Sequence, residues 1–443
     1  MLRLFDTARG DVFPLERREP GKVSMYVCGP TVYGPPHLGH GRFSLVFDVL
    51  RRYLEWGGDE VRYVSNITDV DDNIIKRANR EERDWHDVAL KCEAVWWQAM
   101  DAIGVKRPTE DPHASAFIER MVELIGSLVE RGIAYETSDG VYFQAERVED
   151  YGLLARQSID SLRSGARVEA NEEKRSPVDF ALWKKVKPGE PSWPSPWGDG
   201  RPGWHTECVV MSLDLLGDRF DLHGGGQDLA FPHHENERAQ AVALGHRFAT
   251  HWVHNGFVEV DGEKMSKSLG NFTNLLDLIE TTDPRAYRLL VLQSHYRAPI
   301  EVSKDTAAAA AKALERLDTF ARRFVAAQGG VADDAALERF RERMDDDLDT
   351  PAAMALLFDL VRRANADDDE RAAATAFVIA DAVGLPLRTA SGDVGDDAHE
   401  LARRRDEARA QRDFALADAL RDQLQQLGYE VSDTPSGTAL RKR

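Results

Sequence analysis

The feature that most constrains the fold is a strand, a glycine- and proline-bearing loop, a helix and a second strand that follow one another near the N-terminus. Residues 23–28 have the composition of a buried strand, and the loop 29–36 follows them. A helical period of apolar residues begins near His37 and ends at Gly57-Gly58, before a second strand-like segment at 61–64. This order predicts the opening of a nucleotide-binding α/β domain with a parallel sheet. The loop lacks the G-x-G-x-x-G spacing, so a dinucleotide site is poorly supported.

The rest of the chain predicts further domains, because 443 residues exceed what one core supports and favour two to four domains. Amphipathic stretches near 84–103 and 113–131 precede a predicted hairpin of 134–136 and 141–143. Residues 170–203 are rich in proline, glycine, lysine and tryptophan. We predict an irregular insertion there, because proline at this density prevents long helices and central strands.

The C-terminal part is predicted to be helical from residue 304 onward, and Thr350-Pro351 has the capping residue and first-turn proline of a helix start. A flexible linker is expected at 389–398, followed by a small domain. Residues 401–443 carry nine Lys or Arg against seven Asp or Glu, although the whole chain has a net charge of −19. A local basic face suits a nucleic-acid partner, but a solvated helix face explains this balance equally well.

Composition and cysteine usage exclude several classes of protein. Hydrophobic residues make up 42% and charged residues 30%, as in soluble globular chains. No apolar run approaches the ~18 residues that span a bilayer, and no signal-peptide core follows Met1, so we expect a cytoplasmic protein without a membrane partner. Cys28, Cys92 and Cys208 are odd in number and widely spaced, which argues against a disulfide framework. Each is a buried hydrophobe, a catalytic thiol or a metal ligand, and Cys92 lies inside an amphipathic stretch and is expected to be buried.

The tetrapeptide His37-Leu38-Gly39-His40 is placed where the first predicted loop enters a helix. A helix N-terminus presents free N–H groups and the positive end of the macrodipole, both of which favour phosphate. Two imidazoles three residues apart lie on one helix face and could both donate to a triphosphate, while Gly39 leaves room for a flat ring. Taken alone, the tetrapeptide is better explained by two ordinary surface or core histidines.

A second segment, Lys264-Met265-Ser266-Lys267-Ser268, combines two lysines and two hydroxyls shortly before a glycine. Positioned cations of this kind neutralise the charge of a leaving pyrophosphate. A solvated Lys/Ser loop is the alternative, and the paired histidines make the functional interpretation more credible.

Together these segments resemble the HIGH and KMSKS signatures of class I aminoacyl-tRNA synthetases, with leucine for isoleucine in the first. Longer segments resemble the cysteinyl members of that family over essentially the whole chain. They are residues 26–33, 66–72, 203–208, 223–226 and 231–237. The resemblance implies a Rossmann-like α/β catalytic domain with an insertion, followed by an α-helical bundle and a small C-terminal anticodon-binding domain.

The resemblance also implies domain boundaries. The expected parts are 1–115 and 196–250 for the catalytic domain, 116–195 for the insertion, 251–303 for the KMSKS loop and stem-contact region, 304–388 for the bundle and 399–443 for the anticodon domain.

A single zinc ion is implied by the same resemblance, with Cys28, Cys208, His233 and Glu237 as ligands. Spacing alone cannot show this, because the ligands are scattered, although His233 and Glu237 are four residues apart and share a face if helical. Cysteine and serine differ by one atom, which a shape-only pocket discriminates by only ~1–3 kcal/mol. A soft-metal site binds a thiolate and ligates a serine hydroxyl poorly, so no editing domain is required.

The resemblance further places Thr68, Trp204 and His223 near the amino acid, with core packing as the alternative for each. It assigns ATP to His37, Gly39, His40, Lys264 and Lys267, with Mg²⁺ carried by the nucleotide. The expected reaction is attack of the cysteine carboxylate on the α-phosphate and transfer of the acyl group to tRNA-Cys by a monomer.

Two alternative functions remain open at this point. A related ligase of thiol biosynthesis joins activated cysteine to an amino sugar, but its small acceptor requires no C-terminal anticodon domain. A non-catalytic tRNA-binding paralogue would have lost the signature residues, which are present here. One departure is that Ala439-Leu440-Arg441 follows Gly437-Thr438, where the family commonly has a tryptophan suited to stacking on an anticodon base.

Overall fold

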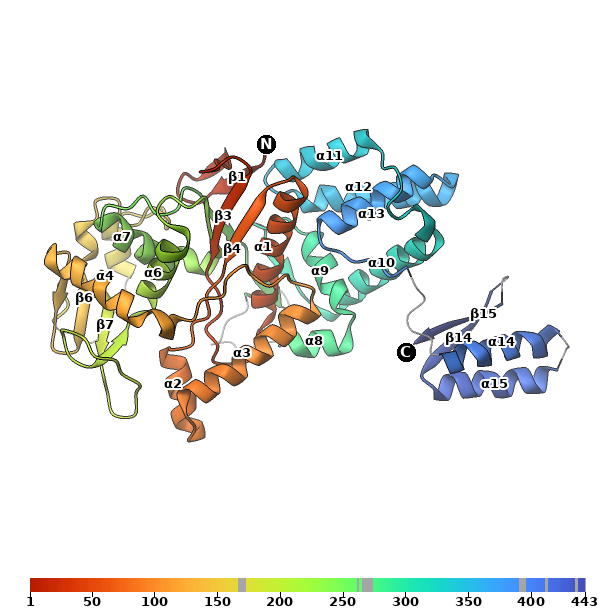
Figure 1. The fold of residues 1–443 in the computed structure, drawn as a ribbon, viewed down its shortest axis with the longest axis horizontal. Helices are drawn as coiled ribbons and strands as arrows, with labels where there is room; N and C mark the ends of the chain where they lie inside the picture. The colour runs from red at the N-terminus through yellow and green to blue at the C-terminus, as the bar shows by residue number, and fades with distance from the viewer. Residues whose placement is uncertain are drawn as a thin grey trace. The chain divides into compact units, whose positions relative to one another are not determined.

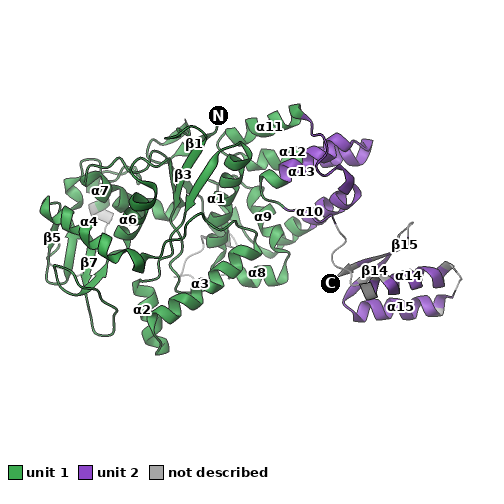
Figure 2. Cartoon of the chain, viewed as in Figure 1, with its two compact units in different colours: residues 1–311, 334–357, 381–385 green, residues 312–333, 358–380, 386–443 purple. Residues whose placement is uncertain are grey.

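Two compact units make up the chain in the computed structural model, which describes residues 1–165, 173–260, 263–264, 274–389, 396–410, 413–434 and 437–442. The first unit contains residues 1–311, 334–357 and 381–385, and the second contains residues 312–333, 358–380 and 386–443 (Figure 2). Within the described residues, no helix is both long and apolar enough to cross a membrane.

A four-stranded parallel sheet lies at the centre of the first unit, in the order β10-β9-β3-β4 (Figure 1). The connection from β3 to β4 through α1 confirms the predicted strand–helix–strand order. From β3 the chain passes through α1 to β4 at one edge of the sheet. From β9 it passes to β10 at the opposite edge, so the direction in which successive strands are added reverses between β3 and β9. In open α/β sheets ligands bind beyond the carboxyl ends of the strands at such a reversal. The elements are β3 (Lys22–Val27), α1 (Leu38–Trp56), β4 (Glu60–Val64), β9 (Leu222–Gly226) and β10 (Trp252–Asn255).

Close packing of α1 on this sheet depends on a glycine in β9. A Cβ atom on Gly224 would lie 2.3 Å from the ring of Phe47, a fully buried residue of α1. The same addition to Gly126, in α4 (Ile118–Glu130), would meet no atom within 4 Å.

We therefore expect opposite effects from two Gly→Ala substitutions. Gly224→Ala should lower the stability of the first unit by about 1–3 kcal/mol, because overpacking displaces Phe47. Gly126→Ala should raise stability by up to about 1 kcal/mol, because alanine is the better helix former. Urea-unfolding midpoints measure both changes, and a destabilisation by Gly126→Ala equal to that by Gly224→Ala would contradict the packing argument.

An antiparallel sheet of four strands, in the order β5-β6-β7-β8, follows the first half of the parallel sheet in the chain. The hairpin of β5 and β6 was expected, but the prediction of an irregular segment at 170–203 is wrong for β7, which is a central strand. The reason is that β7 contains no proline; the prolines flank it. The strands are β5 (Ala134–Glu136), β6 (Gly140–Phe143), β7 (Phe180–Lys185) and β8 (Gly200–Pro202).

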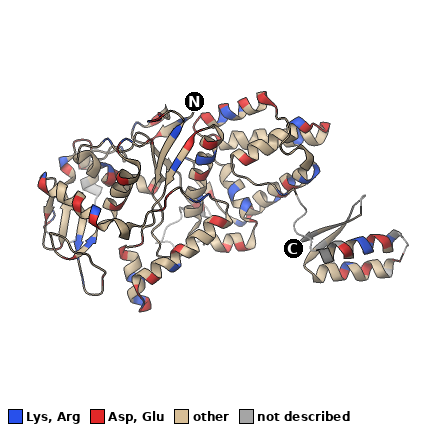
Figure 3. Ribbon diagram, in the orientation of Figure 1, with Lys and Arg blue, Asp and Glu red and all other residues tan. Residues whose placement is uncertain are grey.

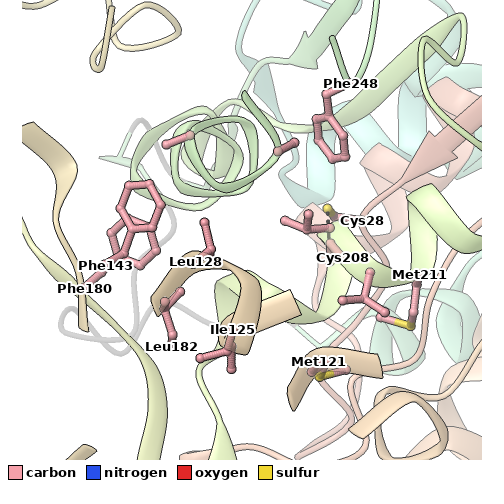
Figure 4. Packing of buried hydrophobic residues seen from close by; sticks show 14 of the residues in the cluster. Cys28, Met121, Ile125, Leu128, Phe143, Phe180, Leu182, Cys208, Met211 and Phe248 are labelled. Carbon is pink, nitrogen blue, oxygen red and sulfur yellow. Dashed lines mark hydrogen bonds between the residues drawn. The ribbon is translucent and has the colours of Figure 1, made fainter. Parts of the chain in front are cut away.

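One apolar core joins this antiparallel sheet to the parallel one. Phe143, Phe180 and Leu182 from the antiparallel sheet belong to the same buried cluster as Cys28 and Cys208 (Figure 4). The helices that contribute to it are α4, α6 (Trp204–Leu216) and α7 (Glu235–Ala243). The two cysteines are therefore held by a rigid, closely packed surrounding.

Shorter elements complete the first unit. α3 confirms the first predicted amphipathic stretch, and α4 occupies most of the second. The elements are β1 (Arg3–Asp6), β2 (Asp11–Pro14), α2 (Asp72–Glu81), α3 (Trp85–Ala102), α5 (Ile159–Gly165), β11 (Val258–Val260), β12 (Glu263–Lys264), α8 (Leu275–Thr281), α9 (Pro284–Leu292), β13 (Ile300–Glu301) and α11 (Asp334–Asp345).

Helices dominate the chain after residue 304, as predicted. α12 begins at Thr350, which was the predicted start, and Phe320 of α10 lies 5.5 Å, between ring centroids, from Phe377 of α13. These helices, which cross the boundary between the two units, are α10 (Lys304–Arg323), α12 (Thr350–Asp367) and α13 (Glu370–Ala382).

The C-terminal end of the second unit is a helical pair with a hairpin. Leu440, two residues after Thr438, packs against its small core. Basic and acidic side chains occur together on its first helix, where Arg403 pairs with Glu400 and Glu407 (Figure 3). The predicted linker 389–398 lies mostly outside the described residues, and a helix begins at Asp396. The elements are α14 (Asp396–Ala410), α15 (Phe414–Gln426), β14 (Tyr429–Thr434) and β15 (Gly437–Lys442).

Candidate active site at the carboxyl ends of the parallel strands

A cavity of about 490 Å³ lies where the sheet topology predicts a ligand site. Its walls come from the loop after β3, the first turn of α1, the segment after β9 and the segment between β10 and β11. The lining residues include Cys28, Gly29, Thr31, Tyr33, His37, Gly39, His40, Asp71, Trp204, Gly226, Asp228, Asn255 and Val258. We call it the first cavity.

His37 and His40 form a reciprocal cap at the start of α1. The His40 backbone N–H donates to His37 Nδ1 at 3.3 Å, and the His37 backbone N–H donates to His40 Nδ1 at 3.2 Å. The two rings are stacked, with 3.6 Å between their centroids. Because each Nδ1 accepts an N–H, a neutral ring must carry its proton on Nε2. Both histidines therefore present an Nε2–H donor in a fixed orientation.

The two rings are neutral at pH 7. Burial lowers the pKa of His37 to about 4 and the pKa of His40 well below its usual value. Positive charge at this helix start therefore comes from the backbone N–H groups of α1 rather than from the imidazoles. Gly39 has a role beyond that predicted, since a Cβ there would lie 2.9 Å from the His37 ring.

Four predicted metal ligands converge beside the first cavity. One donor atom each from Cys28, Cys208, His233 and Glu237 lies within 4.8 Å of the others, and all four residues are buried. The Cys28 Sγ is 3.6 Å from the Cys208 Sγ, which in turn is 3.6 Å from His233 Nε2. His233 Nε2 is 3.0 Å from Glu237 Oε1. We call these residues the four-donor cluster, and they could hold a metal ion.

Burial of the four-donor cluster raises the pKa of both thiols, which favours their protonated form, and lowers the pKa of His233, which favours the neutral imidazole that can act as a ligand. Glu237 is 0% exposed, and a buried carboxylate is costly unless it is paired or coordinated. A second set of donors, Cys28, His223, His234 and Glu237, also lies within 4.8 Å and shares two residues with the first.

Trp204, Thr68 and His223 are all near the four-donor cluster, but in different positions. The Trp204 ring stacks on His233 at 3.9 Å between centroids and lines the first cavity. The Thr68 hydroxyl donates to Glu207 at 3.0 Å, and His223 Nε2 lies 2.8 Å from Glu237 Oε2. Thr68 and His223 are not among the described residues that line the first cavity.

The predicted lysine segment can be placed only in part. Lys264 belongs to β12, and its backbone pairs with Glu259 of β11, next to Val258 in the wall of the first cavity. Lys267 lies outside the described residues. The backbone thus brings the start of this segment to the cavity that contains His37 and His40.

Several polar residues of the site were missed by the sequence interpretation. Asp228 lines the first cavity, Glu207 accepts the Thr68 hydrogen bond, and His205 Nδ1 lies 2.9 Å from His233 Nδ1. Asp228 follows the carboxyl end of a parallel strand, which is a signal that would have identified it. Glu207 and His205 lie on the same helix as Cys208, where no sequence rule separates them from core residues.

Comparison with known protein families covers nearly the whole chain. Residues 14–312 match the model of the "tRNA synthetases class I (C) catalytic domain". Residues 339–384 match the DALR domain, and residues 391–441 match the cysteinyl-tRNA ligase anticodon binding domain.

Individual relatives agree with these matches. The chain is 46% identical to a cysteine–tRNA ligase of Halorhodospira halophila, with 100% of both chains covered, and 43% identical to that of Syntrophotalea carbinolica, again over 100% of both. Among solved structures, the Mycobacterium tuberculosis methionyl-tRNA synthetase bound to methionyl-adenylate has a TM-score of 0.60 at 16% identity, covering 82% of this chain and 89% of the other. That likeness concerns the fold alone. By its family matches and its full-length relatives, the chain belongs to the cysteine–tRNA ligase family of class I aminoacyl-tRNA synthetases.

Proposed function

We propose that this protein activates L-cysteine with ATP and transfers it to the 3′ end of tRNA-Cys. The observation that carries the proposal is a single cavity lined both by the His37/His40 start of α1 and by Cys28 of the four-donor cluster. A nucleotide phosphate group and a thiol side chain can therefore be held next to each other.

The four-donor cluster fits one zinc ion. The Cys28 and Cys208 Sγ atoms lie 3.6 Å apart, so one ion could contact both. Two thiolates, an imidazole and a carboxylate are a donor set that zinc accepts. When bound, zinc supplies a soft Lewis acid that ligates the substrate thiolate and discriminates against the serine hydroxyl.

Neighbouring residues orient these ligands. Trp204 stacks on His233 and fixes the plane of its ring, and His223 fixes Glu237 through its Nε2. The hydroxyl of Thr68 donates to Glu207, on the same helix as Cys208. We therefore assign Thr68 and His223 as positioning residues and Trp204 as a wall of the amino-acid pocket.

The phosphates of ATP bind at the start of α1. The free backbone N–H groups and the Nε2–H donors of His37 and His40 suit a phosphate there, and Gly39 leaves room for the His37 ring. Lys264 and Lys267 supply the positive charge that the neutral imidazoles lack. Mg²⁺ arrives with ATP, and no dedicated protein cage is assigned to it.

No side-chain nucleophile is required for either step. The cysteine carboxylate oxygen forms a bond to the α-phosphorus as the bond to pyrophosphate breaks. The ribose hydroxyl oxygen of the tRNA then forms an ester with the acyl carbon as the acyl–phosphate bond breaks, releasing AMP and a proton. Positioning and charge stabilisation by the residues above account for the rate.

The C-terminal residues 399–443 provide anticodon binding, which is supported by the family match of 391–441. That match favours tRNA over an amino sugar as the acceptor. Retention of His37, His40 and the four-donor cluster favours an active enzyme over a non-catalytic paralogue. The catalytic regions 1–115 and 196–250, the insertion 116–195, the segment 251–303 and the bundle 304–388 remain our proposed division.

Transfer of labelled cysteine to a tRNA-Cys transcript, with ATP and purified protein, tests this proposal. We expect charging that depends on ATP and on the tRNA. Cysteine-dependent pyrophosphate exchange without charging would instead indicate a small-molecule acceptor. Absence of both reactions would indicate the non-catalytic paralogue.

A further inference from the structure

A buried arginine joins the first turns of α1 to one wall of the first cavity. Arg42 lies two residues after His40 and is 1% exposed. Its Nη1 donates to the Phe257 carbonyl, and its Nη2 donates to the carbonyls of Tyr296, at 3.2 Å, and of Ala298. Phe257 lines the first cavity, and Arg42 is not among the described lining residues. The guanidinium is therefore attached to the cavity wall through a backbone carbonyl.

The charge of Arg42 is buried without a counter-ion. In the described part of the chain its hydrogen bonds all go to backbone carbonyls, and burial lowers the pKa of the guanidinium to about 10. A buried charge of this kind is costly, so stability alone does not account for an arginine at this position. Such a departure from ordinary core packing is expected where function requires a fixed geometry.

The contacted carbonyls belong to two segments that pair with each other. The Phe257 carbonyl accepts the Ile300 N–H at 2.9 Å, and the Gly256 N–H donates to the Tyr296 carbonyl at 2.8 Å. A Cβ atom on Gly256 would lie 2.5 Å from the carbonyl oxygen of Arg297, so the segments can approach this closely only at a glycine. Gly256 also lines the first cavity.

Two connections attach α1 to the chain on either side of the predicted lysine segment. Before that segment, β12 pairs with β11, which begins one residue after Phe257. After it, the Leu275 N–H donates at 3.0 Å to the carbonyl of Pro36, the residue before His37. The first connection is made by the Arg42 side chain, and the second by the backbone.

We propose that Arg42 is a positioning residue for ATP, because it fixes the 256–258 wall of the first cavity relative to the phosphate-binding start of α1. It acts through the Phe257 carbonyl and does not touch the nucleotide. This inference rests on the proposed function, since it concerns the ATP of that reaction. A guanidinium suits the task because its planar fork reaches several carbonyls at once, whereas an ammonium is a point charge.

Kinetics of cysteine-dependent pyrophosphate exchange by Arg42→Lys test the inference, because this variant keeps the charge and removes the fork. The KM for ATP should rise by about threefold to tenfold, the range that one lost hydrogen bond produces. The KM for cysteine should not change. A merely structural role would lower the fraction of folded protein, and with it kcat, and would leave both KM values unchanged.

Gly256→Ala tests the same contact from the opposite segment and introduces no buried lysine. Its Cβ atom would displace the carbonyls of Arg297 and Ala298, and Ala298 is one of the acceptors of Arg42. We expect the same selective rise in the KM for ATP. This variant provides the test if Arg42→Lys does not fold.

Arg288→Lys is the matched control, because Arg288 is also 1% exposed but pairs with Asp48 at 2.7 Å. It is not among the described residues that line the first cavity, so its replacement should lower the melting temperature and leave the KM for ATP unchanged.

An unchanged KM for ATP in folded Arg42→Lys, or in Gly256→Ala if the lysine variant does not fold, would overturn the inference. An equal rise in the KM for cysteine, or the same rise in Arg288→Lys, would also overturn it. If the unmodified protein lacked exchange, the proposed function itself would fail, so the two failures are distinguishable.

Discussion

Replacing Cys208 by alanine is expected to lower cysteine-dependent pyrophosphate exchange by more than about 100-fold and to remove bound zinc. Changes to groups that only support a metal ligand cost about 10–100-fold, so loss of a ligand should cost more. Alanine is well tolerated in α6, and Cys208 contributes only a small buried side chain to the core. The loss of pyrophosphate exchange should therefore be larger than any loss that a change in folding stability would cause. Zinc content per chain and the exchange rate measure the two effects.

Cys92→Ala is the matched control, because Cys92 is also a buried free thiol but lies in α3, outside the four-donor cluster. Its Sγ contacts Arg77 at 3.2 Å, so its environment is a packing site near a guanidinium. We expect unchanged zinc content and exchange. Zinc loss in Cys92→Ala, or full zinc content in Cys208→Ala, would contradict the ligand assignment.

A second large decrease in cysteine-dependent pyrophosphate exchange is expected from His37→Asn. Asparagine is a good helix cap, so it preserves the start of α1 while removing the Nε2–H donor that His37 presents. Removal of one such donor to a developing charge costs about 10²–10³-fold in rate. We expect a loss of this size in exchange, with little change in the melting temperature.

The control for this prediction is His86→Asn, at an exposed histidine in the first turn of α3, which should retain wild-type exchange. The pH dependence gives a further check. Because the pKa of His37 is lowered to about 4, its ring stays neutral as the pH falls from 8 to 5.5. An inflection of the exchange rate near pH 6.5 that disappears in His37→Asn would show that a charged imidazole is required.

Much of the fold follows from local sequence patterns. The βαβ unit was predictable because a buried strand, a proline-rich loop and a periodic helix each have a strong signal, and the helix start at Thr350 was predictable from its cap. β7 was not, because proline content was averaged over a window in which a six-residue strand contains none. Its position between β6 and β8 depends on pairing with distant segments, which local composition does not encode.

The candidate site, like β7, depends on contacts between distant segments that local sequence does not encode. Cys28 and Cys208 are 180 residues apart, so only a family resemblance could join them before the structure did. His37 and His40 were identifiable from their spacing, but their mutual capping and their neutral state depend on burial. The placement of Thr68 and His223 near the substrate stays a prediction; in the structure the Thr68 hydroxyl donates to Glu207, and His223 Nε2 lies 2.8 Å from Glu237. Which side chain faces a cavity and which supports a neighbour is a property of packing.

The most direct test of the account compares cysteine and serine as substrates for pyrophosphate exchange, before and after zinc is removed and restored. We predict that the zinc-loaded protein activates cysteine and rejects serine. Removal of zinc should abolish cysteine activation, and added zinc should restore cysteine activation together with the rejection of serine. A zinc-free protein that still activates cysteine and rejects serine at the normal ratio would contradict the claim that the four-donor cluster recognises the substrate through its thiol.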